Sequence, residues 1–314
     1  MDLSPVIKLS QVLIKIDSIT PHDKGCQKLL ADLLKDAGFT IEHKRFGEVD
    51  NLFAWHGENN TARKPGKSLM FLGHTDVVPT GDETHWQHPP FSATIDGDYL
   101  FGRGSADMKA AVAAFTLAMK DYVLENPDHP GKISLMLTSD EEGEAMDGVK
   151  KMMPYISENH EFDYCIVGEP SSSKSLGDVV RIGRRGSLHV LITIHGKQGH
   201  VAYPENAQNP IFLAARFIDD LSAMKWDDGN QDFPPTSFQI SSVKTSSNTS
   251  NIIPADLIIQ ANFRYSPESS ESSLQSQLLH ILEKHQLKYT LKWTLSGLPF
   301  HNKNQDLKIA LHNS

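Results

Sequence analysis

Residues 68–76 read SLMFLGHTD, an apolar run of strand length that ends in a histidine and an aspartate. Two further apolar runs end in acidic residues: residues 133–138 precede three carboxylates, and residues 163–168 precede a glutamate. Helical patterns separate such runs, which is typical of an α/β domain with a largely parallel sheet. Ligands bind outside the carboxyl ends of the strands in such sheets. The sequence therefore predicts that these polar residues converge at one edge.

The residues around this core complete the same domain. Apolar spacing and turn signals predict helices over about 4–16, 24–37 and 105–125, and strands over 40–46 and 51–55.

The pattern changes after about residue 179. Strands are predicted over 188–195, 236–243, 257–264 and 288–295, with helices over 210–224 and 274–285. This βαββαβ order is that of a ferredoxin-like sandwich. We therefore predict a catalytic domain formed by residues 1–178 and 296–314, with residues 179–295 inserted as a second domain. Residues 304–314 begin an amphipathic helix, so we expect a C-terminal piece of the catalytic domain to be missing from this chain.

Composition limits the function classes. The formal net charge of −9 gives no broad basic surface for nucleic acid. Two cysteines cannot form a disulfide framework, which fits a reducing compartment. The first twenty residues lack the features of a signal peptide, and no apolar window is long enough to span a membrane. We expect a soluble cytoplasmic protein whose partners include neither nucleic acid nor a membrane.

His74 and Asp76 follow the first apolar run. A histidine at this position fits a metal ligand, and a carboxylate nearby fits the group that orients its ring. Taken alone, the pair also fits a turn histidine beside a capping aspartate. Asp107 follows a glycine-rich turn and precedes a helix, so for that residue alone a helix N-cap is the favoured interpretation.

Asp140, Glu141 and Glu142 are adjacent carboxylates, and Glu169 stands at the end of a third strand. Such residues are usually an ordinary acidic surface loop. Their repetition at several strand ends favours a metal site, where one carboxylate binds metal and its neighbour carries protons. Imidazole and carboxylates without thiolate suit zinc, cobalt or manganese. Several acids can hold two ions with a bridging carboxylate, which predicts hydrolysis.

The second domain has weaker signals. His200 lies in the glycine-flanked stretch GKQGHVAYP at residues 196–204, and Arg184 and Arg185 form a pair. The histidine fits either a cleft or a turn. The arginines and Arg264 fit carboxylate recognition, but exposed arginines are common.

Four segments resemble the metal-site motifs of the dinuclear zinc aminoacylase/carboxypeptidase family. They are FLGHTDVVP at 71–79, GRGSADMK at 102–109, DEEG at 140–143 and GEP at 168–170. Residues 184–188, 199–204 and 251–254 resemble the branch of this family that acts on N-succinyl amino acids. The resemblance implies a mixed, largely parallel catalytic sheet of the zinc-exopeptidase type with a ferredoxin-like α+β lid, which is also the homodimerisation domain.

The resemblance also implies the cofactor, which is two Zn²⁺ per subunit, with Co²⁺ able to fill one site. One ion is held by His74, Asp107 and Glu169. Asp107 bridges to the second ion, which Glu142 also binds.

The remaining roles are implied in the same way. Glu141 is the general base, Asp76 orients His74, and His200 from the lid of the partner subunit stabilises the oxyanion. The substrate, a small N-succinyl amino acid, is contacted by residues of the second domain: Arg184, Tyr203, Asn251 and Arg264.

Two positions depart from the family pattern. Ser250 stands where this branch has an asparagine. The family's last ligand histidine follows a Gly-Thr-Ser-Asp-Gly-Arg-type loop, and neither has a counterpart here, because His301 and His312 lie in a different context. The alternatives are another amidohydrolase of the family, such as an acetylornithine deacetylase or a dipeptidase, and an inactive paralogue that acts as a dimerising binding module.

Overall fold

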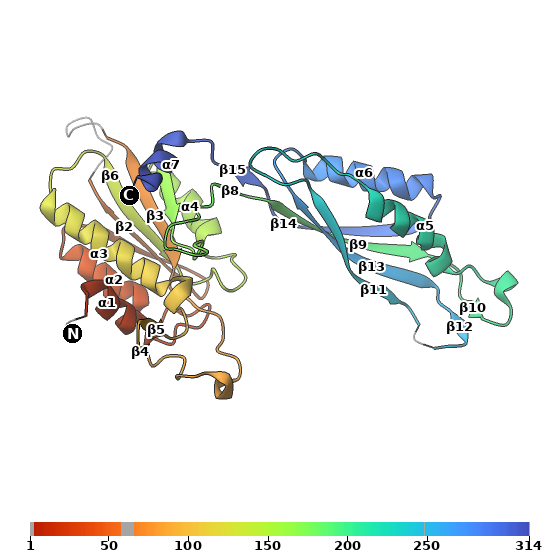
Figure 1. The fold of residues 1–314 in the computed structure, drawn as a ribbon, viewed down its shortest axis with the longest axis horizontal. Helices are drawn as coiled ribbons and strands as arrows, with labels where there is room; N and C mark the ends of the chain where they lie inside the picture. The colour runs from red at the N-terminus through yellow and green to blue at the C-terminus, as the bar shows by residue number, and fades with distance from the viewer. Residues whose placement is uncertain (1–2, 58–65, 248, 314) are drawn as a thin grey trace. The chain divides into compact units, whose positions relative to one another are not determined.

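The computed structural model describes residues 3–57, 66–247 and 249–313, so residues 1, 2, 58–65 and 314 of the predicted catalytic domain and residue 248 of the predicted second domain lie outside the described residues. The chain forms two compact units, Met1–Asp178 and Val179–Ser314 (Figure 1). Residues 296–314 fall in the second unit, and their place in the catalytic domain stays a prediction.

The first unit contains a mixed five-stranded sheet. Its strand order is β1 (Thr40–Phe46), β2 (Val49–His56), β6 (Lys132–Thr138), β3 (Ser68–His74) and β7 (Tyr164–Val167). The strands β6, β3 and β7 run parallel, whereas β1 and β2 are antiparallel to their neighbours. The three parallel strands therefore present their carboxyl ends at one edge, as predicted for an α/β domain.

Helices cover both faces of this sheet (Figure 1). The helices α1 (Pro5–Ile14), α2 (Cys26–Lys35) and α3 (Ala110–Glu125) pack on one face, and α4 (Val149–Ser157) packs on the other. Strand β6 shows the alternation that this requires. Leu135 and Leu137 point into the first core, and Met136 points into the second. Burial of each such side chain stabilises the fold by roughly 1.5–3 kcal/mol.

The third helix, α3, occupies the later part of the predicted range 105–125. Residues Ser105–Lys109 form a separate wide turn, η2, in which Asp107 has extended backbone angles of φ −124° and ψ 99°. Asp107 is therefore not a helix N-cap, because α3 starts only after Lys109. The helix α4, the short turn η1 (Glu83–His85) and the hairpin of β4 (Thr94–Asp96) and β5 (Tyr99–Phe101) were not predicted.

The second unit contains an antiparallel four-stranded sheet. Its strand order is β11 (Ser237–Thr245), β13 (Asp256–Tyr265), β9 (Gly186–His195) and β14 (Tyr289–Gly297). The helices α5 (Pro210–Ala223) and α6 (Glu271–Lys284) complete the predicted βαββαβ order and share a core with the sheet. The smaller elements are β8 (Gly183–Arg184) with β15 (Phe300–His301), β10 (Gly199–His200) with β12 (Ile252–Ile253), η3 (Pro204–Asn206) and α7 (Gln305–His312).

Within the described ranges, no helix combines the length and apolar composition that crossing a membrane requires.

Candidate metal centre

His74 is the last residue of β3 and is completely buried. Its Nδ1 atom lies 2.9 Å from the backbone oxygen of Asp76 and 3.5 Å from Oδ1 of the same residue. The carbonyl oxygen can only accept, so Nδ1 carries a proton and donates it. When the ring is neutral, Nε2 is therefore the nitrogen that carries the lone pair, and this is the form that binds metal.

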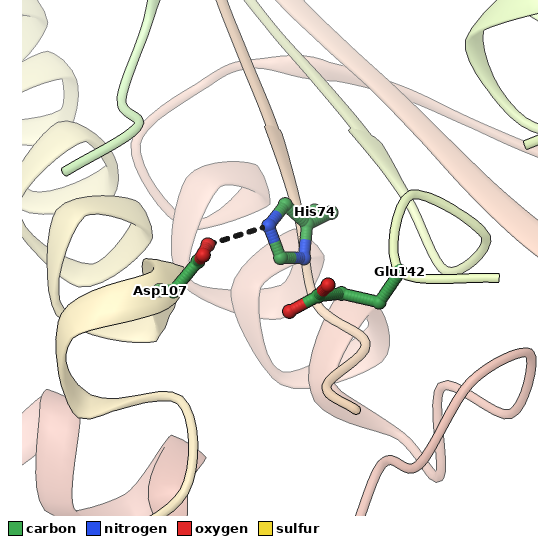
Figure 2. Close-up of side chains that lie close together, drawn as sticks. All are labelled: His74, Asp107 and Glu142. Carbon is green, nitrogen blue, oxygen red and sulfur yellow. Dashed lines mark hydrogen bonds and ion pairs between the residues drawn. The ribbon is translucent and has the colours of Figure 1, made fainter. Parts of the chain in front are cut away.

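Asp107 faces this nitrogen. Its Oδ1 atom lies 3.1 Å from Nε2 of His74, and its side chain is about half exposed, at 47 %. Figure 2 shows the Asp107 carboxylate beside the imidazole and the Glu142 carboxylate reaching toward the same ring from a different loop. The extended backbone of η2 directs the Asp107 side chain to this position instead of to the N–H groups of α3.

The loop after β6 supplies Glu141 and Glu142. The buried carboxylate of Asp76 accepts hydrogen bonds from both of their backbone N–H groups, at 3.3 and 3.1 Å. Asp140 has a different role from its two neighbours, because its carboxylate accepts the backbone N–H groups of residues 145–147. Asp76 thus holds the acidic loop beside His74, and Asp140 closes that loop.

Glu169 completes the cluster after β7. Its Oε1 atom lies 3.6 Å from Nε2 of His74. Gly73 precedes His74 and Gly168 precedes Glu169, and both glycines face Met108. An added Cβ would lie only 2.6 and 2.7 Å from Met108 Cε. The buried Met108 side chain therefore packs against both glycines, and a larger residue at either position would require it to shift.

Two groups of donor atoms share His74. One consists of His74, Asp107 and Glu142, and the other of His74, Glu141 and Glu169. Within each group all ligand atoms lie within 4.8 Å of one another. The structure therefore brings together all six residues predicted for the first domain, namely Asp76 and these five.

The electrostatics of the cluster are those of a site short of positive charge. Burial raises the pKa of Glu142, and repulsion from Asp107 adds to this effect. Burial and the neighbouring Asp107 raise the pKa of Glu169 to about 7. Burial alone would lower the pKa of His74, but hydrogen bonding and attraction to Asp76, followed by attraction to Glu141, raise it to about 9. Divalent cations would relieve this repulsion, so the residues fit a metal centre.

The predicted residues of the second domain form two separate groups. His200, Tyr203 and Asn251 lie together: the rings of His200 and Tyr203 are 5.9 Å apart, and the backbone oxygen of Asn251 accepts the N–H of Val201. This loop follows the end of β9.

Arg184 and Arg264 lie at the other end of β9. Arg264 pairs with Ser187, and the Arg184 guanidinium lies against Gly297, which also pairs with Ser187. A ten-residue strand spans roughly 30 Å, so these arginines and His200 cannot form one site within a single chain. The five residues of the two groups are all exposed.

Several residues that support the cluster were not predicted as functional. They are Met108, Lys109, Thr75 and Asp23, all buried. Met108 and Lys109 lie inside the recognised motif around Asp107, and Thr75 lies inside the motif around His74, which is the signal that could have found them. Asp23 lies far from any motif, and its contact with Thr75 appears only in the folded chain.

The comparisons with known proteins agree with this geometry. A model of peptidase family M20/M25/M40 matches residues 70–314. Succinyl-diaminopimelate desuccinylase of Hydrogenovibrio crunogenus is 49 % identical over 300 residues, which cover 95 % of this chain and 78 % of that protein.

Two solved structures share the fold. A putative aminohydrolase of methicillin-resistant Staphylococcus aureus is 18 % identical with a TM-score of 0.73, covering 98 % of this chain and 80 % of that one. The YXEP protein of Bacillus subtilis, described as a dinuclear metal-binding M20 peptidase, is 15 % identical with a TM-score of 0.67, covering 98 % and 78 %. The predicted resemblance, the α/β fold and the enzyme class, an amide-bond hydrolase, are confirmed. The chain belongs to peptidase family M20/M25/M40.

Proposed function

We propose that this protein hydrolyses N-succinyl-LL-2,6-diaminopimelate to succinate and LL-2,6-diaminopimelate, in the cytoplasm, as a step of diaminopimelate and lysine biosynthesis. The observation that carries the proposal is the convergence of His74 with four carboxylates from three further loops. The name of the 49 % identical relative supports the choice of substrate.

The cofactor of this proposal is a pair of Zn²⁺ ions, one of which Co²⁺ can replace. His74, Asp107 and Glu169 would hold the first ion, and Asp107 with Glu142 would hold the second, although the two donor groups of the structure join Asp107 to Glu142 and Glu169 to Glu141. Nitrogen and oxygen donors without thiolate suit these metals. The dinuclear description of the Bacillus subtilis protein supports two ions. When bound, such ions lower the pKa of a water molecule and polarise a carbonyl group.

Glu141 is the general base of this proposal. Its carboxylate lies 3.9 Å from Nε2 of His74, compared with 3.1 Å for Asp107 and 3.6 Å for Glu169. It is also the most exposed of the three, at 50 %. Of these three carboxylates, the most exposed one is best suited to exchange protons with water and substrate. It takes a proton from the attacking water and gives it to the leaving amine.

Asp76 positions both partners of this chemistry. Its backbone oxygen fixes the His74 ring, and its carboxylate holds the N–H groups of Glu141 and Glu142. One buried residue therefore sets the distance between the metal ligand and the base.

The second unit binds the substrate in this proposal. The substrate carries several carboxylates, which suit the guanidinium groups of Arg184 and Arg264. His200 of the partner subunit stabilises the oxyanion, with Tyr203 and Asn251 beside it. The separation of this loop from the arginines along β9 supports a contribution from a second chain. The homodimer forms through the second unit, where β11 is an edge strand of the four-stranded sheet and pairs with β13.

The test is succinate release from N-succinyl-LL-2,6-diaminopimelate by purified protein with Zn²⁺ or Co²⁺, in competition with acetylornithine and a dipeptide. We expect preferential desuccinylation that chelators abolish. Preferential deacetylation of acetylornithine would assign a different amidohydrolase of the family. Binding of these compounds without any turnover at excess metal would favour the inactive binding module.

A further inference from the structure

Residues 13–23, which run from the last turn of α1 into the connection to α2, contact three of the loops that carry the proposed ligand and base residues. They lie outside residues 70–314, which the family model matches. We call them the 13–23 segment. The inference below concerns what holds the metal centre in shape and rests on the proposed metal site.

The first contact is with the loop after His74. The hydroxyl of Ser18 donates to the backbone oxygen of Thr75 at 2.7 Å. The N–H of Val77 donates to the backbone oxygen of Ser18 at 2.9 Å, and the N–H of Thr20 donates to the backbone oxygen of Val77 at 3.0 Å. The loop is therefore paired along the segment in the manner of a short parallel strand, which fixes its backbone on both sides of Asp76.

Asp23 adds a side-chain anchor to the same loop. Its carboxylate accepts the hydroxyl of Thr75 at 2.6 Å and the N–H groups of Gly25 and Gln27 at the start of α2. Asp23 is only 4 % exposed, and Thr75 stands between His74 and Asp76. The carboxylate therefore ties the first turn of α2 to the residue between a metal ligand and its orienting group.

The second contact is with the acidic loop. The hydroxyl of Ser139, two residues before Glu141, donates to the backbone oxygen of Pro21 at 2.7 Å. Ser139 is completely buried and also accepts the N–H of Asp50 at 3.1 Å. The position of the acidic loop is thus set by the same segment that holds Thr75.

The third contact is with the turn that carries Asp107. The ammonium of Lys109 donates to the backbone oxygens of Leu13 at 2.9 Å and Ile16 at 2.7 Å. Lys109 is only 1 % exposed, and these oxygens lie at the carboxyl end of α1, where a cation is favoured by the helix dipole. Burying an ammonium group is unfavourable unless its hydrogen bonds are satisfied, and these two backbone oxygens accept hydrogen bonds from Lys109.

We propose that the 13–23 segment is a brace that sets the spacing of His74, Asp107 and the acidic loop, and that Asp23 and Lys109 are positioning residues of the metal centre. Neither residue lies among the ligand donor groups. Both residues act through the backbone of loops whose carboxylates repel one another. Loss of either contact should therefore let the ligand side chains move apart and weaken metal binding.

The test is titration with Co²⁺, read by calorimetry and by the visible absorption that reports ligand geometry. In Asp23→Asn, one of the three hydrogen-bond donors faces an NH₂ group. We expect the Co²⁺ dissociation constant to rise about 10- to 100-fold, the effect of losing an outer-shell partner. The matched control is Asp163→Asn, because Asp163 accepts the N–H of Ser68 at the opposite end of β3. Its Co²⁺ affinity and spectrum should match the wild type.

Lys109→Met tests the other anchor, with Lys132→Met as the control. Lys132 is also a buried lysine but lies at the start of β6 and contacts His160. We expect weaker Co²⁺ binding and an altered spectrum only for Lys109→Met. Equal losses in both lysine variants would indicate general destabilisation and overturn the role of Lys109.

Thr75→Val and Thr75→Ser keep the inference testable if the other variants do not fold. Valine removes the hydroxyl that Asp23 accepts and should weaken Co²⁺ binding, whereas serine retains it and should preserve binding. Wild-type affinity and spectra in Asp23→Asn, Lys109→Met and Thr75→Val would overturn the brace alone. A wild-type protein that binds no Co²⁺ would overturn the proposed metal site itself.

Discussion

The two units place their polar residues in opposite ways. In the first unit, three parallel strands end at one edge, so residues far apart in sequence reach a shared centre around a buried histidine. In the second unit, the strands are antiparallel, and the polar residues of interest lie exposed at both ends of β9. Parallel strands can build a centre within one chain. The antiparallel sheet instead exposes one polar surface at each end of β9. A site formed by two chains can use one of these surfaces from each chain.

Among variants that test this difference between the two units, we expect the largest change in metal content and kcat from Asp107→Asn. Asp107 is the proposed bridging ligand, and an amide cannot supply its charge. We expect loss of metal and a fall in kcat of more than about 10³-fold, since bound ions contribute several kcal/mol of transition-state stabilisation. Metal analysis and desuccinylase rates measure both changes.

The second unit provides the matched control for this variant. Asp256 also faces a histidine, with its Oδ1 2.7 Å from Nδ1 of His195. Asp256→Asn should leave metal content and kcat at wild-type values. A similar loss of metal and of kcat in Asp107→Asn and Asp256→Asn would mean that the aspartate–histidine pairs of the two units contribute equally. That result would contradict the difference between the two units.

The next effect concerns Glu141, the proposed base. Glu141→Gln should lower kcat by about 10²- to 10⁴-fold, the range for loss of general acid–base catalysis, with metal content unchanged. Glu142→Gln should instead lower metal content. Rates and metal analysis of both proteins test the division of roles between adjacent glutamates. Metal loss in Glu141→Gln would assign Glu141 to the ligands.

These adjacent glutamates also illustrate what the sequence could predict. The strand ends were predictable because apolar runs followed by polar residues fix where parallel strands terminate. The separate role of Asp140 was not, because its hydrogen bonds to residues 145–147 depend on how the loop closes. Asp107 taken alone favoured a helix cap, and only its extended backbone excludes that. Asp23 carries no local pattern, since its partner Thr75 is distant in sequence.

A smaller effect would test whether the second unit acts across two chains. His200→Ala should lower kcat by about 10²- to 10³-fold, as expected for removal of one oxyanion donor, with metal content unchanged. Mixing it with inactive Glu141→Gln should restore activity, because a mixed dimer contains one site with both residues intact. Dissociation and reassociation followed by rate measurement would show this. No recovery in verified mixed dimers would place His200 in the site of its own chain.

The smallest expected effect is a pH dependence that only the first unit should show. Below pH 9 the metal-free site holds a proton on His74, and below about pH 7 Glu169 holds a second one. Metal must displace these protons. Affinity should therefore fall about tenfold per unit as pH decreases from 9 to 7, and more steeply below 7.

The sign is the same for the stability of the metal-free protein. Both groups have folded-state pKa values above their ordinary ones, so their contribution is fully present at low pH and is lost as pH rises through about 7 and then about 9. Metal binding should reverse this trend, because a bound cation replaces the missing protons. Calorimetry in two buffers of different ionisation enthalpy counts the protons released, with about one expected at pH 8 and about two well below pH 7. If no proton is released at pH 8, His74 is already neutral in the free site, and the charge imbalance that distinguishes this unit from the other is not what draws metal to it.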